Sequence, residues 1–199
     1  MIIKSVFADG YKNLSDVDIK PHERMNIFCG DNAQGKTNLI EAVWLMTGCR
    51  SFRGTRDRDF IGFEKEKASI RLSFQDSFRS QDISFEVRKN NIREKNIALN
   101  GVKVPLLSRL FGSLKCVVFT PEDLFIAKGS PDNRRSFVDL SSSQLKKSFV
   151  YALNKYENLL SQRYALINKI NFTGSGSAYD LDIWAVQLAK TGANISVIR

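Results

Sequence analysis

The sequence is poor in cysteine and histidine and has no long apolar run, and each shortage excludes a class of protein. Its three cysteines among 199 residues form neither a C-x-x-C pair nor an even set, which argues against a disulfide framework. With His22 as the single histidine, no histidine pair is available to hold a metal. No apolar run approaches the ~20 residues that a membrane helix needs. We therefore expect a soluble, cytoplasmic protein with reduced, structural thiols and no membrane partner.

Acidic residues are also fewer than basic ones. The chain has 21 Asp and Glu against 30 Lys and Arg, which gives a net charge of +9 and a pI near 9.6. This excess favours a polyanionic partner such as nucleic acid, and a solvated basic surface without a partner is the alternative that charge alone leaves open. Because 43% of the residues are hydrophobic, we expect one large globular domain, or one domain plus an appendage.

The most informative motif is a phosphate-binding loop of the pattern G-x-x-x-x-G-K-[ST], which ends in Lys36 and Thr37. Successive backbone N–H groups of such a loop point inward at the α- and β-phosphates. Lys36 is expected to neutralise β- and γ-phosphate oxygens, and the Thr37 hydroxyl to bind Mg²⁺. The expected nucleotide-binding residues are Gly30, Asp31, Asn32, Ala33, Gln34, Gly35, Lys36, Thr37 and the adjacent Asn38.

The segments on either side of the loop agree with this interpretation. Met25–Cys29 is a short, mostly apolar run suited to a buried parallel strand that leads into the loop. An apolar pattern from Thr37 to Thr47 predicts a helix whose positive end faces the phosphates, and Gly48 is placed to end it. A glycine-rich turn before a core helix is the alternative. The order of strand, loop and helix favours the phosphate site.

A hairpin is predicted before the loop, with strands over residues 2–8 and 14–19. Lys12 and Asn13 lie at its tip, where a cation and an amide could reach a nucleotide. The sequence alone favours a solvated turn at this position.

An arginine-rich loop is predicted after the helix. Residues 50–59 hold four arginines and two aspartates, with Phe52 among them. Arginine suits bidentate phosphate contacts and Phe52 offers a stacking face, so ATP or a nucleic-acid backbone is a reasonable ligand. A ladder of Arg and Asp that solvates a surface loop is the alternative. The candidate phosphate-binding residues here are Arg50, Arg53, Arg56 and Arg58.

The periodicity of the apolar residues changes to two over residues 68–99, which predicts an antiparallel meander. Asn100-Gly101 predicts a tight turn at its end. A short helix is predicted over residues 105–111, and a second buried strand over residues 116–119.

Two helix starts follow, each with a capping residue and a proline, at Thr120 and at Ser130. Arg134 and Arg135 lie one turn into the second of these helices, where they could reach phosphate or a partner subunit. Alternatively, Arg135 could pair with Asp139 at a spacing of four residues.

Longer amphipathic helices are predicted over residues 144–170 and 180–199, with a Gly- and Ser-rich linker at 171–178 between them. The last helix reaches the end of the sequence without a capping residue. We therefore expect that the chain is part of a longer protein.

Four segments taken together closely resemble the RecF family of bacterial DNA repair ATPases, which have ABC/SMC-type heads. They are the GxNxxGKT loop with Asn32, the start of the arginine loop at 49–51, FTPEDL at 119–124, and the SPxxRRxFxD segment within 128–139. The resemblance implies an α/β fold, a P-loop NTPase head with a mixed or parallel core sheet, an antiparallel β-meander and the start of a helical second lobe. It places the head at residues 1–143 and a helical arm, incomplete at its C-terminus, at 144–199.

The resemblance also implies ATP and Mg²⁺ as cofactors of Gly30–Thr37, with Lys12 and Asn13 near the nucleotide and the arginine loop facing phosphate. Members of the family recognise gapped or single-stranded DNA and, with RecO and RecR, help to load the RecA recombinase. A full-length member would form an ATP-dependent homodimer.

Two motifs of the family are missing from this sequence. It contains no Ser-x-Gly-Gln signature and no apolar run that ends directly in paired acids, which would hold Mg²⁺ and activate water. We therefore expect a chain that binds nucleotide but hydrolyses essentially none. A GTPase is disfavoured because the N-K-x-D pattern fails at its fourth position in residues 154–157 and 168–171. A DNA-binding module that is independent of nucleotide remains the main alternative.

Overall fold

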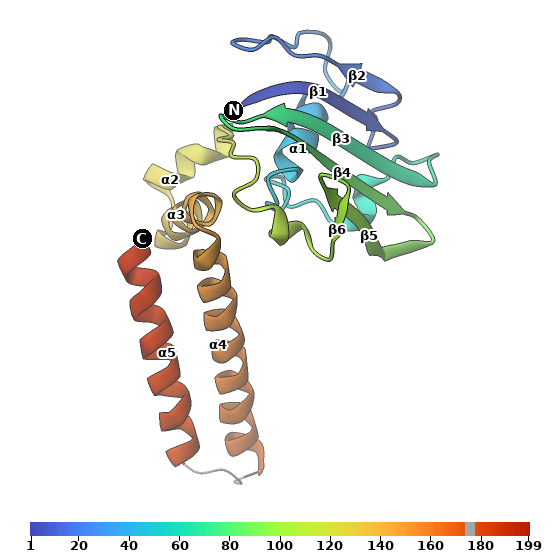
Figure 1. The fold of residues 1–199 in the computed structure, drawn as a ribbon. Coiled ribbons are helices and arrows are strands. Elements are labelled where there is room, and N and C mark those ends of the chain that lie inside the picture. Colours follow the sequence, from blue (N-terminus) through green and yellow to red (C-terminus); the bar gives the residue numbers. More distant parts are fainter. Residues whose placement is uncertain (174–177) are drawn as a thin grey trace. The chain divides into compact units, whose positions relative to one another are not determined.

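The computed structural model describes residues 1–173 and 178–199, which form two compact units, Met1–Phe119 and Thr120–Arg199 (Figure 1). The expected division between residues 143 and 144 falls inside a helix of the second unit, α3 (Pro131–Leu145). The P-loop, the hairpin before it and the arginine loop all belong to the first unit.

The first unit is built on a six-stranded sheet of order β2-β1-β3-β4-β5-β6, in which every neighbouring pair is antiparallel. The mixed or parallel core sheet that was predicted is therefore not found among the described residues. The meander predicted over residues 68–99 is confirmed as three of these strands. Asn100 and Gly101 form the turn that follows, both with positive φ (52° and 76°), as the predicted tight turn requires. The strands are β1 (Ile2–Asp9), β2 (Val17–Ile19), β3 (Lys67–Gln75), β4 (Ser80–Arg88), β5 (Asn91–Leu99) and β6 (Val102–Val104).

One face of this sheet is buried, because alternate side chains along each strand are apolar and point to the same side. The helix α1 (Lys36–Leu45) packs against that face, as Figure 1 shows, and shares its core. The helix predicted over residues 37–47 is thereby confirmed. The core cluster includes Val6, Ala8, Leu39, Ala42, Leu45, Ile70, Leu72, Phe74, Ile83, Phe85, Val87 and Ile97.

Two predicted buried strands, Met25–Cys29 and Cys116–Phe119, are wrong. Neither run forms a strand, and Ile27 and Val117 are 81% and 91% exposed. A buried parallel strand needs neighbours that pair with its backbone and layers that cover both faces. Among the residues that the structure describes, no strand pairs with either run.

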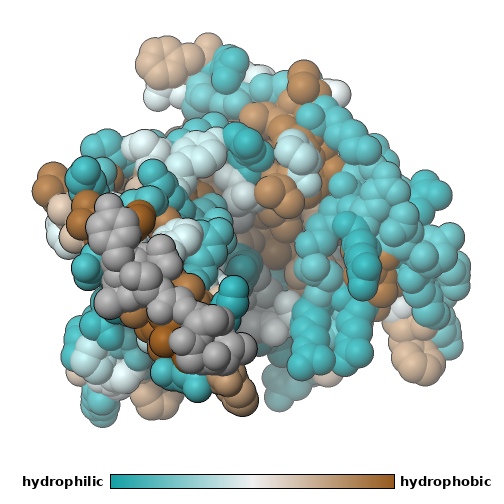
Figure 2. Space-filling model, turned by 90° about the horizontal axis from the view of Figure 1, so that it is seen from below, coloured by the Kyte–Doolittle hydropathy of each residue, from teal (hydrophilic) through white to brown (hydrophobic). Residues whose placement is uncertain are grey.

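The surface seen in Figure 2 is mostly hydrophilic and carries separate apolar patches.

Smaller differences concern the lengths of elements. The second hairpin strand is shorter than predicted, since β2 covers only Val17–Ile19. The helix predicted over 105–111 is a single 3₁₀ turn, η2 (Leu107–Leu110). The arginine loop ends in another such turn, η1 (Asp57–Phe60).

The second unit is helical. Thr120 begins it as predicted, with a capping box in which the Thr120 backbone N–H donates to Asp123 Oδ2 at 2.6 Å. Its elements are η3 (Pro121–Leu124), α2 (Phe125–Lys128), α3 (Pro131–Leu145), α4 (Lys147–Thr173) and α5 (Ala178–Ile198). Residues 171–173 of the predicted linker continue α4, Ala178 begins α5, and 174–177 lie outside the described residues. None of the described helices has the length and apolar composition of a membrane span.

Candidate functional site

The P-loop turns through backbone conformations that favour glycine and leads into the uncapped start of α1. Gly35, the residue before the helix, has φ 95°, and no side chain caps the first turn, which also lacks acidic residues. A Cβ on Gly35 would lie 2.8 Å from Asn13 Oδ1 and 2.8 Å from Leu14 Cδ2. The hairpin therefore presses directly against the loop. The free N–H groups and positive dipole of α1 suit an anion at this point.

Lys36 lies within the turn of the P-loop. Its Nζ donates hydrogen bonds to the backbone carbonyl oxygens of Gly30 (2.7 Å) and Asp31 (2.6 Å). These are neutral acceptors, and phosphate oxygens would be stronger partners for an ammonium group. Thr37 follows with an exposed side chain. The residues present thus fit a triphosphate, and the Thr37 hydroxyl is the one that would hold Mg²⁺.

Three predicted residues from separate segments meet beside the loop. Asn13 Nδ2, at the hairpin tip, donates to the Ala33 carbonyl oxygen at 2.6 Å. Asn38 Nδ2 donates to Asn13 Oδ1 at 2.7 Å, and Arg53 donates to Asn38 Oδ1 at 3.0 Å. A continuous line of hydrogen bonds therefore joins the arginine loop, α1, the hairpin and the P-loop.

Lys12, predicted to lie near the nucleotide, is bound to a residue that the sequence did not single out. Its Nζ forms an ion pair with Glu41 and donates to Thr55 Oγ1 at 3.1 Å. Glu41 is fully buried in α1. A signal was available, since Glu41 is an acid among apolar positions of a predicted core helix.

Tyr11, next to Lys12, also faces this buried acid. Its hydroxyl is buried and, within the described part of the chain, has no hydrogen-bond partner. Burial, and then the negative charge of Glu41, raise the pKa of the Tyr11 phenol far above its usual value. The phenol therefore stays protonated.

The four arginines of the loop differ in their surroundings. Only Arg53 is bonded to the P-loop helix, through Asn38. The side chains of Arg50 and Arg56 are exposed, and Arg58 forms an ion pair with Asp59 at 3.4 Å. Arg53 therefore lies beside the first turn of α1, whereas Arg58 pairs with its neighbour Asp59.

Arg134 and Arg135 belong to the second unit. Arg134 donates to the carbonyl oxygen of Gly129 at 3.2 Å. Of the two alternatives for Arg135, the pair with Asp139 does not form, since Arg135 binds Asp132 at 2.5 Å. Asp139 instead accepts two hydrogen bonds of 2.7 Å from Arg199, a bidentate pair that satisfies its carboxylate.

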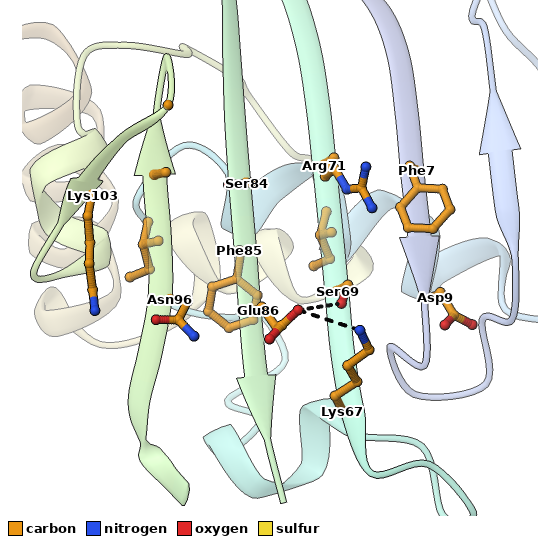
Figure 3. A pocket seen from close by; sticks show the side chains of 14 residues that line it. Phe7, Asp9, Lys67, Ser69, Arg71, Ser84, Phe85, Glu86, Asn96 and Lys103 are labelled. Carbon is orange, nitrogen blue, oxygen red and sulfur yellow. Dashed lines mark hydrogen bonds and ion pairs between the residues drawn. The ribbon is translucent and has the colours of Figure 1, made fainter.

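A shallow cavity of about 470 Å³ lies on the open face of the sheet (Figure 3). The Arg71 guanidinium stacks over the Phe7 ring at 4.9 Å, and Glu86 accepts from Ser69 and pairs with Lys67 at 3.7 Å. The lining of the cavity contains no residue of the P-loop, the hairpin tip or the arginine loop. The predicted phosphate site is therefore separate from this cavity.

Comparisons with known proteins agree with the P-loop interpretation. The family model of the AAA ATPase domain matches residues 1–194. The DNA replication and repair protein RecF of Alkaliphilus oremlandii is 37% identical over 199 residues, which are 100% of this chain and 53% of that protein. A solved structure of RecF with ATP, described as the recombination mediator protein of the RecFOR pathway, matches with a TM-score of 0.90 and 34% sequence identity. The match covers 99% of this chain and 52% of the RecF chain.

These matches extend along the whole chain, which spans about half the length of the curated relatives. The resemblance to the RecF family and the predicted α/β class of head, with its antiparallel meander, are confirmed.

Proposed function

The chain belongs to the AAA ATPase domain family, and from that premise we propose that it binds ATP with Mg²⁺ at Gly30–Thr37. The observation that carries the proposal is the position of Lys36, whose ammonium lies in the turn of the loop beside the uncapped N-terminus of α1. Lys36 would neutralise the β- and γ-phosphates, and the helix N-terminus would add its own positive charge. The related RecF solved with ATP supports the same ligand.

The other site residues act on the loop and the metal. Thr37 would contribute its hydroxyl to Mg²⁺, which supplies charge neutralisation of the phosphates. Asn13 would hold the shape of the loop through the Ala33 carbonyl, and Asn38 would hold Asn13 in place. Arg53 would be the arginine of its loop that contacts phosphate, a role supported by its hydrogen bond to Asn38, the residue after Thr37.

The proposed biological role is that of a recombination mediator. The intact protein would recognise single-strand gaps in DNA, act with RecO and RecR, and help to load the RecA recombinase. The net charge of +9 suits a DNA partner, and the exposed side chains of Arg50 and Arg56 are candidates for contacts with its phosphate backbone. Arg58 is a further candidate, which would exchange its ion pair with Asp59 for a DNA phosphate. Arg134 and Arg135 are further candidates for phosphate contacts. An ATP-dependent homodimer of the intact protein belongs to the same proposal.

Hydrolysis is not expected of these residues alone. The signature motif and the acid that would activate water do not occur in the sequence, so the charge-stabilising and general-base parts of phosphoryl transfer are lacking. Binding without turnover is therefore the expected behaviour of the 199-residue chain.

Calorimetric titration with ATP and Mg²⁺ tests this function, with Lys36→Ala as the variant and Lys89→Ala as a matched surface control. Lys36→Ala should lower the affinity at least about tenfold, because hydrogen bonds to charged groups contribute about 1.5–3 kcal/mol. Equal ATP affinity in all three proteins would refute a P-loop site. A DNA affinity that ignores ATP and falls steeply with salt would instead favour the nucleotide-independent module.

A further inference from the structure

Glu41 is a fully buried carboxylate for which the phosphate site described so far has no use. It lies on α1, four residues after Thr37, with apolar core residues on both sides. Burying a charge is costly unless it is paired and hydrogen-bonded, so its partners indicate what keeps it there.

The partners of Glu41 come from two segments that lie far apart in the sequence. Lys12, from the hairpin tip, forms an ion pair with Oε2. Ser51 and Thr55, from the arginine loop, donate their hydroxyls to Oε1, the second of them at 3.1 Å. Thr55 Oγ1 also accepts from Lys12 at 3.1 Å, which closes a ring of three side chains, Lys12, Glu41 and Thr55, and the Ser51 hydroxyl joins this cluster through Glu41.

Within this cluster, Ser51 determines the backbone shape of the arginine loop. Ser51 Oγ, whose proton is committed to Glu41, accepts hydrogen bonds from the backbone N–H groups of Arg53 (3.1 Å) and Thr55 (3.3 Å). The turn that carries Arg53 is therefore folded around a hydroxyl that Glu41 orients. Arg53 in turn reaches Asn38, the residue after Thr37.

We propose that Glu41 is a positioning residue, which fixes the arginine loop beside the P-loop so that Arg53 meets the nucleotide phosphates in one geometry. The expected effect of Glu41 on ATP affinity rests on the proposed function. The expected effect of Glu41 on the arginine loop is independent of that function. Because α1 carries both Glu41 and the P-loop threonine, the two phosphate-facing segments share one rigid support. ATP binding at the P-loop should then increase the order of the arginine loop, and an ordered arginine loop should increase the affinity for ATP.

The test uses Ser51→Ala, which removes the hydroxyl that shapes the loop and leaves the buried ion pair of Glu41 with Lys12 intact. Glu41→Gln is the second variant. Ser73→Ala is the matched control, since it removes another bond from a serine hydroxyl to a carboxylate, that of Asp82, on the open face of the sheet. Trypsin cleavage of the native protein after Arg53 and Arg56, measured by mass spectrometry, reports loop order, and calorimetry reports ATP affinity.

Ser51→Ala should raise cleavage within the loop at least about fivefold relative to cleavage elsewhere, since about fivefold is the change expected for one lost hydrogen bond and this hydroxyl makes three. It should also lower ATP affinity several-fold and abolish the protection of the loop by ATP, with the same thermal midpoint as Ser73→Ala. Loop cleavage and ATP affinity that stay at the wild-type level in both Ser51→Ala and Glu41→Gln would overturn the inference. Wild-type protein that binds no ATP, yet shows the cleavage increase in Ser51→Ala, would refute the proposed function and leave the positioning of the loop supported.

Discussion

The side-chain amide of Asn38 donates a hydrogen bond of 2.7 Å to the side-chain oxygen of Asn13, which ties the first turn of α1 to the tip of the β1–β2 hairpin. The side-chain amide of Asn13 in turn donates a hydrogen bond to the Ala33 carbonyl oxygen, which connects the hairpin tip to the P-loop. Ala33 has φ 65°, a left-handed conformation that is uncommon for a residue with a side chain. The hairpin thus stabilises the least favourable backbone position of the loop.

Asn13→Ala should therefore weaken ATP binding without removing a phosphate ligand. The variant loses two hydrogen bonds that shape the loop, each contributing about 1 kcal/mol, so we expect an affinity up to about thirtyfold lower by calorimetry. Asn91→Ala is the control, because it removes an exposed amide that binds Glu94 in β5. Wild-type affinity in Asn13→Ala would show that the loop keeps its shape without the hairpin.

Lys12→Ala should be among the most destabilising single substitutions of the first unit. It leaves the fully buried Glu41 without its cation, and breaking a buried pair in this way costs about 3–5 kcal/mol. Urea unfolding followed by circular dichroism measures the loss. In a Glu41→Gln background, Lys12→Ala should cost much less, because no unpaired charge is left behind. Equal costs in both backgrounds would contradict a pairwise role for this ion pair.

The three thiols should differ strongly in reactivity. Cys29 is exposed directly before Gly30, whereas burial raises the pKa of Cys49 and that of Cys116 to about 11. At pH 8 a thiol of that pKa is ionised to the order of one part in a thousand, and the thiolate is the reactive form. A disulfide reagent should label one cysteine rapidly in the folded chain and three in urea. Cys29→Ser should abolish the rapid phase, and ATP should slow it in the wild type.

The sequence patterns that were confirmed are those in which local information suffices. The helix α1 follows from a helical period, and the meander of β3 to β5 follows from alternation with a turn at Asn100-Gly101. The strand predicted over Met25–Cys29 is wrong because an apolar run shows only that its side chains could be buried. Whether the run forms a strand depends on partner strands elsewhere in the chain. The exposure of Cys29, expected to be a structural thiol, has the same cause.

The polar network around the loop could be predicted only as separate parts. Lys12, Asn13, Asn38 and the arginine loop were each candidates, but no pattern in the sequence shows that Arg53 reaches Asn38 across fifteen positions. Glu41 was the missing element. A helical position that is buried and acidic signals a specific partner, and the identity of that partner requires the tertiary structure.

Asp76 should make the stability of the β3–β4 turn depend on pH. Its carboxylate accepts hydrogen bonds from the backbone N–H groups of Phe78 (2.7 Å) and Arg79 (2.8 Å), which lower its pKa below the ordinary 3.8. Since the folded state favours the ionised form, this stabilisation is complete above the ordinary pKa and is lost as the pH falls through the lowered one. Asp76→Asn should therefore be less stable than the wild type at pH 7, with a difference in urea midpoint that shrinks toward pH 3. Asp18→Asn, an exposed change in β2, serves as the control, and a difference for Asp76→Asn that is the same at both pH values would contradict the role of the carboxylate charge.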